Sequence, residues 1–240
     1  MITDPLFRAD AYLRAASGRV IAHTPDGGII LDRTIFYATS GGQPGDSGQL
    51  QWGGEMLDIG TAVKDDGGAI LLMPVAPAAL PPVGAEVRQT IDWTRRYRHM
   101  RVHTALHLLS VVVPFAVTGG QIGADKGRLD FDMPEPPADT ADLEAAINAL
   151  IARDLPVTDS WISDEELDAN PGLVKTLSVR PPRGQGRVRL VCIGQGADQI
   201  DLQPCGGTHV ARTGEIGAVT LGRIENKGRQ NRRLSVLLGN

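Results

Sequence analysis

The stretch Arg101–Leu109, RVHTALHLL, places two histidines four residues apart in an apolar run. Apolar side chains recur at helical spacing as far as Val113, and Pro114 ends the pattern. Asp92 or Thr94 stands where a helix cap is needed. The stretch therefore predicts the first helix of the chain, and it lies just after a change in sequence pattern.

The segment before this helix has the pattern of a small β domain. Residues 1 to about 90 contain short β-like runs punctuated by glycine and proline, such as Gly18–His23 and Gly28–Asp32. The proline-dense stretch Met73–Gly84 precedes the change of pattern. The pattern is typical of a small all-β barrel or sandwich, and we expect this domain over residues 1–90.

The segment after residue 90 mixes helices with strands. A helix is predicted over Ala141–Arg153 with Thr140 as its cap, and a short one begins at Ser163 with Glu166 as capping partner. Strand-like runs follow at Arg187–Ile193, Ala218–Leu221 and Arg233–Leu238. Helices and strands segregated in this way favour an α+β domain with an antiparallel sheet over residues 91–240.

Composition limits the class of protein. Of 240 residues, 42% are hydrophobic and 22% charged, and no apolar run approaches the roughly eighteen residues of a bilayer span. The start, Met1–Pro5, lacks the basic and apolar regions of a signal peptide. We therefore expect a soluble, cytoplasmic protein with no membrane role. A disulfide between Cys192 and Cys205 is not expected in that compartment.

Basic residues gather in two places, although the net charge is −4. One group precedes the paired histidines and the other lies near the end of the chain, where Glu225 is the only acidic residue. These residues are Arg95, Arg96, Arg98 and Arg101, and then Arg223, Lys227, Arg229, Arg232 and Arg233. Two such groups favour a confined site for a polyanion, although solvated surface arginines would give the same pattern.

Two distant motifs together predict a metal site. His103 and His107, at positions i and i+4, project from one side of a helix with Cβ atoms about 6 Å apart. Cys205 and His209 have the same spacing in QPCGGTH, where proline and glycines prevent a regular helix and predict a tight loop. Three imidazoles and a thiolate suit tetrahedral zinc. Either pair alone would be weak support.

Other residues near these motifs are assigned lesser roles. His99 continues the histidine ladder, which turns by about 40° per step, so we interpret it as an outer-shell or solvent-facing residue. Cys192 lies in an apolar run and is expected to be a buried, inert thiol. Thr104 follows His103 where a HExxH peptidase has its glutamate, which disfavours that chemistry. A purely structural zinc remains an alternative.

The motifs resemble a known family. HTALHLL (103–109), CGGTH (205–209), GGQIGADKGRLDFD (119–132) and IGAVTLGRIENKGRQNRR (216–233) resemble the editing domain of alanyl-tRNA synthetase. FYATSGGQPGDSG (36–48) resembles the glycine-rich motif upstream of that domain in medium-length AlaX proteins, the free-standing relatives. Leu106 stands where a polar residue is common in the family, so it could alter the pocket wall.

The resemblance implies a fold and an activity. The fold would be a translation-factor-like β-barrel followed by the α+β editing fold of threonyl- and alanyl-tRNA synthetases. The activity would be ATP-independent, zinc-dependent hydrolysis of mischarged tRNA(Ala), with Ser-tRNA(Ala) as main substrate and Gly-tRNA(Ala) as a second candidate. Such a trans-editing enzyme would serve translation fidelity and bind the tRNA(Ala) acceptor end.

The resemblance also implies site residues. The catalytic zinc would be held by His103, His107, Cys205 and His209. Substrate-binding residues would be Thr39, Gly42, Gln43, Asp46 and Gln121, although the glycine pairs 41–42 and 119–120 could equally serve only as turns. Phosphates of the tRNA would meet Lys227, Arg229, Arg232 and Arg233. Two alternatives stay open: an RNA-binding module with structural zinc, and a zinc-dependent esterase or amidase acting on a small substrate.

Overall fold

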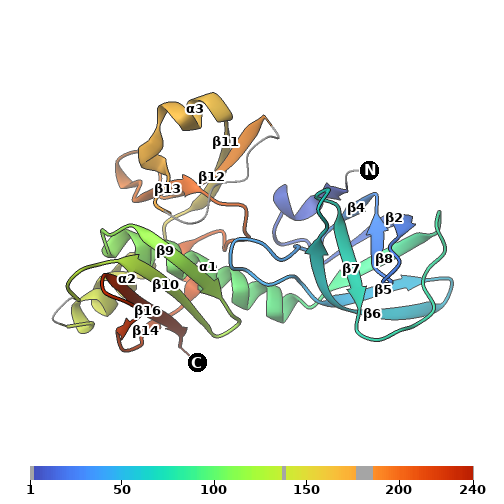
Figure 1. Ribbon diagram of the computed structural model, residues 1–240, viewed down its shortest axis with the longest axis horizontal. Helices are drawn as coiled ribbons and strands as arrows, with labels where there is room; N and C mark the ends of the chain where they lie inside the picture. Colours follow the sequence, from blue (N-terminus) through green and yellow to red (C-terminus); the bar gives the residue numbers. More distant parts are fainter. Residues whose placement is uncertain (1–2, 137–138, 177–185, 240) are drawn as a thin grey trace. The chain divides into compact units, whose positions relative to one another are not determined.

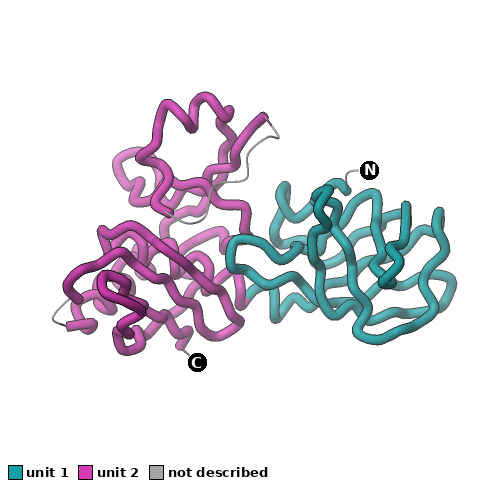
Figure 2. Tube along the Cα trace, viewed as in Figure 1, with its two compact units in different colours: residues 1–97 teal, residues 98–240 magenta. Residues whose placement is uncertain are grey.

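The chain divides into two units, residues 1–97 and residues 98–240 (Figure 2). The computed structural model describes residues 3–136, 139–176 and 186–239. Among these, the helices lack the length or the apolar character that a bilayer crossing requires. Each unit is described below by itself.

Six antiparallel strands of the first unit close into a barrel (Figure 1). They are β2 (Ala15–His23), β3 (Ile29–Leu31), β5 (Gly48–Trp52), β6 (Glu55–Lys64), β7 (Ile70–Pro74) and β8 (Glu86–Ile91), in the spatial order β2-β3-β7-β6-β5-β8. The β5–β6 hairpin turns at Gly53 and Gly54, whose φ angles of 51° and 89° suit a two-residue turn with positive φ at both positions. The prediction of an N-terminal β-barrel is confirmed.

Alternating side chains fill the barrel. In β8, Val87, Gln89 and Ile91 are buried while their neighbours face outward or are half-buried. Gln89 is a polar residue inside an apolar core, but its amide is satisfied: the oxygen accepts from the Thr34 hydroxyl at 2.6 Å and the nitrogen donates to the Arg33 carbonyl at 3.0 Å. These bonds tie β4 (Arg33–Thr34), which pairs in parallel with β1 (Asp4–Pro5), to the barrel; the 3-10 turn η1 (Leu6–Arg8) follows β1.

The second unit contains two antiparallel sheets. The larger has the order β14-β16-β10-β9, and β15 (Glu225–Asn226) also pairs with β16. Its strands are β9 (Val117–Ile122), β10 (Lys126–Asp132), β14 (Val219–Leu221) and β16 (Asn231–Leu238). The smaller sheet is β11 (Val157–Ser163), β12 (Arg187–Ile193) and β13 (Asp201–Pro204). The α+β class with antiparallel sheets is therefore confirmed.

The helix α1 (Trp93–Val112) begins in the first unit, and from Arg98 onward it belongs to the second unit (Figure 1). Its residues 102–110 are all buried, as expected for a helix covered on every side. One face carries Val102 and Leu106, which lie so close to β10 that a Cβ on Gly127 would come 2.5 Å from Val102 and 2.9 Å from Leu106. Leu106 therefore packs against the large sheet, and its suggested effect on the pocket wall stays a prediction.

Local capping interactions explain where the helices begin. The Asp92 carboxylate accepts from the Arg95 amide at 3.0 Å, so Asp92 caps α1. Ser163 and Glu166 form the predicted capping box of α3 (Asp164–Ala169). Thr140 occupies the N-cap position of α2 (Ala141–Ala152) as predicted, but its side chain makes no capping bond; the Asp139 carboxylate instead accepts from the Ala141 amide at 2.9 Å. Three further 3-10 turns, η2 (Pro171–Leu173), η3 (Gly196–Asp198) and η4 (Thr213–Ile216), lie in connections.

Candidate metal centre

The paired histidines occupy the face of α1 next to the one that contacts the large sheet. His103 and His107 are 8% and 6% exposed, and their ring centroids are 5.3 Å apart. Each follows a sheet-contacting residue, Val102 or Leu106, by one position, which is about 100° of helix rotation. The same helix therefore packs on one sheet and presents two imidazoles toward the other.

The loop after β13 brings the second pair of ligands to this face. The Cys205 amide donates to the Arg189 carbonyl at 3.1 Å, which continues the β12–β13 ladder by one residue. The Arg189 guanidinium donates to the Cys205 carbonyl at 3.2 Å and to the Gly207 carbonyl at 2.9 Å. Beyond the loop, the Val210 amide donates to the Thr104 hydroxyl of α1 at 3.2 Å. These bonds fix the loop between the small sheet and the helix.

The four side chains His103, His107, Cys205 and His209 form a group that could hold a metal ion, with ligand atoms all within 4.8 Å of one another. Cys205 Sγ lies 3.4 Å from His103 Nε2 and 3.5 Å from His209 Nε2, and the Nε2 atoms of His107 and His209 are 3.2 Å apart. Tetrahedral zinc with ordinary bond lengths separates two nitrogens by about 3.3 Å and nitrogen from sulfur by about 3.5 Å. The donor set and its spacing therefore fit such an ion.

Electrostatics favour a cation in this group. Burial would raise the pKa of the Cys205 thiol, but the neighbouring His103 and His209 imidazoles hold it well below its usual value. Burial lowers the pKa of His209 to about 3, so this imidazole is neutral near pH 7 and its lone pair is available. A thiolate and neutral imidazole nitrogens are the forms in which these residues bind metal.

A buried carboxylate orients His107. The Asp201 side chain is fully buried, and its Oδ2 accepts from His107 Nδ1 at 2.8 Å, which directs Nε2 toward the other ligands; metal binding there releases the Nε2 proton. Lys175 Nζ lies 2.6 Å from Oδ1, and Gln203 donates to Oδ2 at 2.8 Å. Burial would lower the pKa of His107, yet the hydrogen bonds and negative charges of Asp201 and Cys205 raise it to about 9. Burial would raise the pKa of Asp201, yet His107 and Lys175 lower it to about 2.

Asp201 and its partners were not identified from the sequence. A signal was present, because residues 201, 203 and 205 alternate along β13 and its extension and so lie on one face. His99 is 2% exposed and lies outside the group of four, so the solvent-facing interpretation is wrong. Cys192 is half-buried rather than buried and donates to the Gly194 carbonyl at 3.3 Å.

Cys205 is the least buried of the four candidate ligands. The three histidines are buried, whereas Cys205 is half-buried and Gly206 beside it is exposed. A Cβ added to Gly206 would meet no atom within 4 Å, so the space next to the Cys205 loop is open. Among the four ligands, Cys205 therefore lies nearest to open space.

The glycine-rich segment of the first unit forms a tight hairpin. The Ser40 and Gln43 backbones exchange two hydrogen bonds, of 3.1 and 2.9 Å, around Gly41 and Gly42, whose φ angles are 55° and 82°. The Thr39 hydroxyl accepts from the Gly45 amide at 2.9 Å and donates to the Ala62 carbonyl of β6 at 3.3 Å. The segment is thus anchored on the barrel. The substrate-binding roles of Thr39, Gly42 and Gln43 stay predictions.

Asp46 anchors the end of the same segment. Its carboxylate and the Arg96 guanidinium form a fully buried ion pair, with Arg96 Nε 3.0 Å from each carboxylate oxygen. The Tyr37 amide also donates to Asp46, at 2.6 Å, and Arg96 donates to the Ile35 carbonyl at 2.7 Å. The observed contacts of Asp46 are therefore structural, and its predicted contact with substrate stays a prediction.

The basic group before the paired histidines is engaged within the protein. Arg96 belongs to the buried ion pair, Arg98 pairs with Asp125, and Arg101 donates to the Ile216 carbonyl at 2.9 Å. These three guanidinium groups hold parts of their own units together. Their contacts therefore do not support the interpretation of these three arginines as part of a polyanion site.

Of the four basic residues near the end of the chain that we predict to bind tRNA, two are exposed and two make contacts within the unit. Lys227 and Arg229 are exposed in the β15–β16 hairpin, where Lys227 lies 2.8 Å from Glu225. Arg232 is 9% exposed and donates to backbone carbonyls, including that of Pro134 at 2.8 Å. Arg233 makes a two-pronged ion pair with Asp130, at 2.7 and 2.9 Å.

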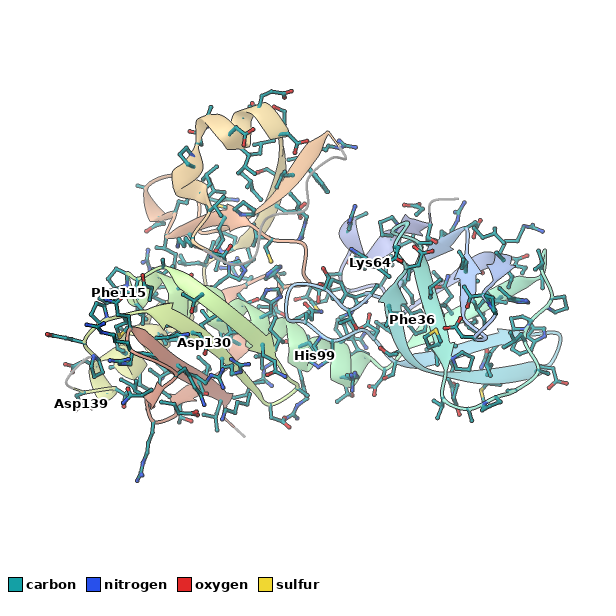
Figure 3. All side chains as sticks on the ribbon, viewed as in Figure 1. Phe36, Lys64, His99, Phe115, Asp130 and Asp139 are labelled. Carbon is teal, nitrogen blue, oxygen red and sulfur yellow. The ribbon has the colours of Figure 1, made fainter. Side chains whose placement is uncertain are left out.

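Asp130 lies on β10 (Figure 3) and also accepts from Arg128 at 2.8 Å. Gln121, the remaining predicted substrate residue, is exposed on β9 and accepts from Arg128 at 3.2 Å. Gln121, Arg232 and Arg233 thus make contacts within the second unit. The substrate role of Gln121 and the tRNA-binding roles of the four basic residues stay predictions.

Comparisons with known proteins bear on this site. The family model for the threonyl and alanyl tRNA synthetase second additional domain matches residues 188–235, and that for class II (A) tRNA synthetases matches residues 14–95. The alanyl-tRNA editing protein AlaX-M of Methanosarcina acetivorans is 37% identical over 97% of this chain and 98% of that protein. This chain belongs to the AlaX-M family of alanyl-tRNA editing proteins.

Other relatives support the same assignment. AlaX-M of Saccharolobus solfataricus is 33% identical over 97% of this chain and 98% of its own length. The alanine–tRNA ligase of Pyrobaculum arsenaticum is 34% identical over 93% of this chain, which matches 25% of that longer enzyme. The predicted family is therefore confirmed. The first family model covers Cys205 and His209, and thus the metal-ligand loop lies in the part shared with the synthetase domain.

Proposed function

We propose that this protein is a zinc-dependent trans-editing hydrolase that deacylates mischarged tRNA(Ala). Ser-tRNA(Ala) is the main proposed substrate and Gly-tRNA(Ala) a second one. The observation that carries the proposal is the gathering of His103, His107, Cys205 and His209, with ligand atoms within 4.8 Å, in a member of a family of alanyl-tRNA editing proteins. The donor spacing supports zinc as the ion.

Bound zinc would supply a Lewis acid beside the aminoacyl ester. The protein's part is to hold that ion on three imidazoles and one thiolate and to fix the His107 ring through Asp201. The ester would approach from the Cys205 side, where a Cβ added to Gly206 would meet no atom within 4 Å. Ester hydrolysis needs less assistance to its leaving group than amide hydrolysis, which is consistent with a metal group that includes no glutamate among the described residues.

Selection of serine over alanine requires polar groups near the side chain of the aminoacyl group. An apolar pocket rejects an added hydroxyl poorly, whereas a site with hydrogen-bonding groups can favour it. We assign this task to Thr39, Gly42, Gln43 and Asp46 of the glycine-rich hairpin and to Gln121 of β9. The rigid anchoring of the hairpin on β6 suits a selective site, because a fixed donor loses less entropy on binding.

The tRNA backbone would meet the exposed β15–β16 hairpin. Lys227 and Arg229 are the accessible cations, and the Lys227–Glu225 pair is weak because both side chains are more than a third exposed. Arg232 and Arg233 would support the hairpin through Pro134 and Asp130. In a plot of the logarithm of the binding constant against the logarithm of the salt concentration, removing one phosphate contact reduces the slope by about one. Such a reduction in Lys227→Ala would support the assignment.

Deacylation of Ser-, Gly- and Ala-tRNA(Ala) tests the proposal directly. The intact protein should hydrolyse Ser-tRNA(Ala) and spare Ala-tRNA(Ala), and Cys205→Ala should lose the activity. Cys192→Ala is the matched control, because Cys192 is the other free cysteine and lies outside the metal group. The control should retain full activity.

The same assay separates the alternatives. A structural zinc in an RNA-binding module predicts that no ester is cleaved and that zinc removal unfolds the protein. An esterase or amidase for small substrates predicts turnover of simple esters without salt-sensitive tRNA binding. Either result would contradict the proposal.

A further inference from the structure

One large aromatic side chain is exposed in the sheet that carries Cys205. Trp161, on β11, is 41% exposed, and of the exposed large hydrophobic residues described in the second unit only Phe115 accompanies it. Phe115 lies between α1 and β9, outside this sheet (Figure 3). Exposure of a tryptophan costs hydrophobic free energy that burial would recover, and exposed aromatic rings are enriched where a partner binds.

Strand register places Trp161 in one row with a metal ligand. Trp161 pairs directly with Arg189 of β12, and Arg189 in turn faces Cys205, whose amide donates to the Arg189 carbonyl. Neighbouring strands are about 4.8 Å apart, so the Cα atoms of Trp161 and Cys205 are separated by about 10 Å. A single nucleotide can span that distance.

The same register places these side chains on one face of the sheet. Directly opposed residues of an antiparallel pair point to the same side, so Trp161 and Arg189 share a face with Cys205. Asp201 and Gln203 lie on that face too, and both contact His107. The face that carries Trp161 is therefore the face that meets the metal centre.

Positive charge accompanies the ring. The Arg187 guanidinium lies over Trp161, 5.3 Å from the ring centroid. Arg189 sits between Trp161 and Cys205 and is held by Asp159 at 3.3 Å as well as by the loop carbonyls. An aromatic ring beside a guanidinium group is an arrangement on which unpaired RNA bases stack, with the cation next to the phosphate.

We propose that Trp161 is the stacking platform for the terminal unpaired base of the tRNA whose aminoacyl ester lies at the metal centre. The inference rests on the proposed function and adds to it a binding site for the 3′-terminal adenine. The Trp161–Arg189–Cys205 row leads across the sheet to the metal centre, and a Cβ added to Gly206 at its end would meet no atom within 4 Å. Trp161 thus positions the ester, and Arg187 supports the ring.

Fluorescence of the bound base tests this site separately from hydrolysis. The probe is uncharged tRNA(Ala) in which 2-aminopurine replaces the 3′-terminal adenine, because its emission is quenched by stacking. Wild-type protein should quench it, Trp161→Phe should retain most of the quenching, and Trp161→Ala should lose it. One stacked base contributes about 1–3 kcal/mol, so kcat/KM for Ser-tRNA(Ala) should fall at least about fivefold in Trp161→Ala.

Phe115→Ala is the matched control, since Phe115 is 42% exposed and lies outside the sheet. It should change neither the quenching nor kcat/KM. Normal Ser-tRNA(Ala) hydrolysis with unchanged quenching in Trp161→Ala would overturn the stacking site and leave the proposed function intact. A wild-type protein that neither binds the probe nor hydrolyses Ser-tRNA(Ala) would overturn both.

Discussion

The Nδ1 atom of His107 lies 2.8 Å from the Oδ2 atom of Asp201, inside the protein and on the side of the ring away from the metal-binding nitrogen. A carboxylate in that position fixes the tautomer and the rotation of the imidazole. Lys175 and Gln203 hold the carboxylate in turn. The centre therefore consists of four ligands and the buried polar residues that orient one of them.

Replacing this carboxylate should weaken metal binding. Asp201→Asn keeps the shape of the side chain but removes its charge, and such changes typically cost 10- to 100-fold in metal affinity, or about 1.4–2.7 kcal/mol. Competition with a chelating zinc indicator measures the affinity. Asp198→Asn is the control, because Asp198 is a largely exposed aspartate that pairs with Arg153 in the same unit. Equal affinities for both variants would show that Asp201 does not orient the ligand.

The ion pair of Asp46 and Arg96 should dominate the stability of the first unit. Asp46→Ala would leave the Arg96 guanidinium buried without its counter-charge, which costs about 3–5 kcal/mol. Chemical denaturation measures the free energy of unfolding. Asp58→Ala, at an exposed position on β6, should change it little. Unaltered stability in Asp46→Ala with lost hydrolysis would instead indicate that Asp46 acts mainly on the substrate.

The Asp130 cluster should make stability depend on pH. Burial would raise the pKa of Asp130, but hydrogen bonds from Arg233 and Arg128 hold it below its usual value. A carboxyl with a lower pKa in the folded state stabilises the protein above its unfolded pKa of about 3.9, and the contribution is lost as the pH falls through the folded pKa. The difference in unfolding free energy between wild type and Asp130→Asn should therefore shrink below about pH 4.

Urea unfolding at several pH values measures this difference. Asp132→Asn is a suitable control, because Asp132 is exposed on the same strand. A difference for Asp130→Asn that stays constant down to pH 3 would mean that the Arg128 and Arg233 contacts do not hold the carboxylate in its charged form.

Much of the fold was predictable because local signals agree with it. The run Arg187–Ile193 became β12 with the same bounds, and the capping box at Ser163 begins α3 as expected. The strand β11 was not predicted, since VTDSWIS contains mostly polar side chains and much of it is exposed in the structure. The strand β9 was not predicted either, because Gly119 and Gly120 suggested a turn. In the structure these two glycines pair with β10 in an extended conformation.

The candidate site was predictable only in part. The i, i+4 spacing of His103 and His107 and the glycines after Cys205 are local features that signal metal ligands. Asp201, Lys175 and Arg189 act across the fold, and their partners are 94, 26 and 16 residues away in sequence. Their roles follow from strand register and from the packing of β13 against α1, which no short motif encodes.

Removal and return of zinc is the most direct test of the central claim, that four side chains hold a catalytic ion. The protein is stripped with a chelator, and hydrolysis of Ser-tRNA(Ala) and the circular dichroism spectrum are measured before and after zinc is added back. We predict that hydrolysis disappears on stripping and returns with zinc, while the spectrum stays largely unchanged. Full hydrolysis by metal-free protein, verified by elemental analysis, would contradict the account.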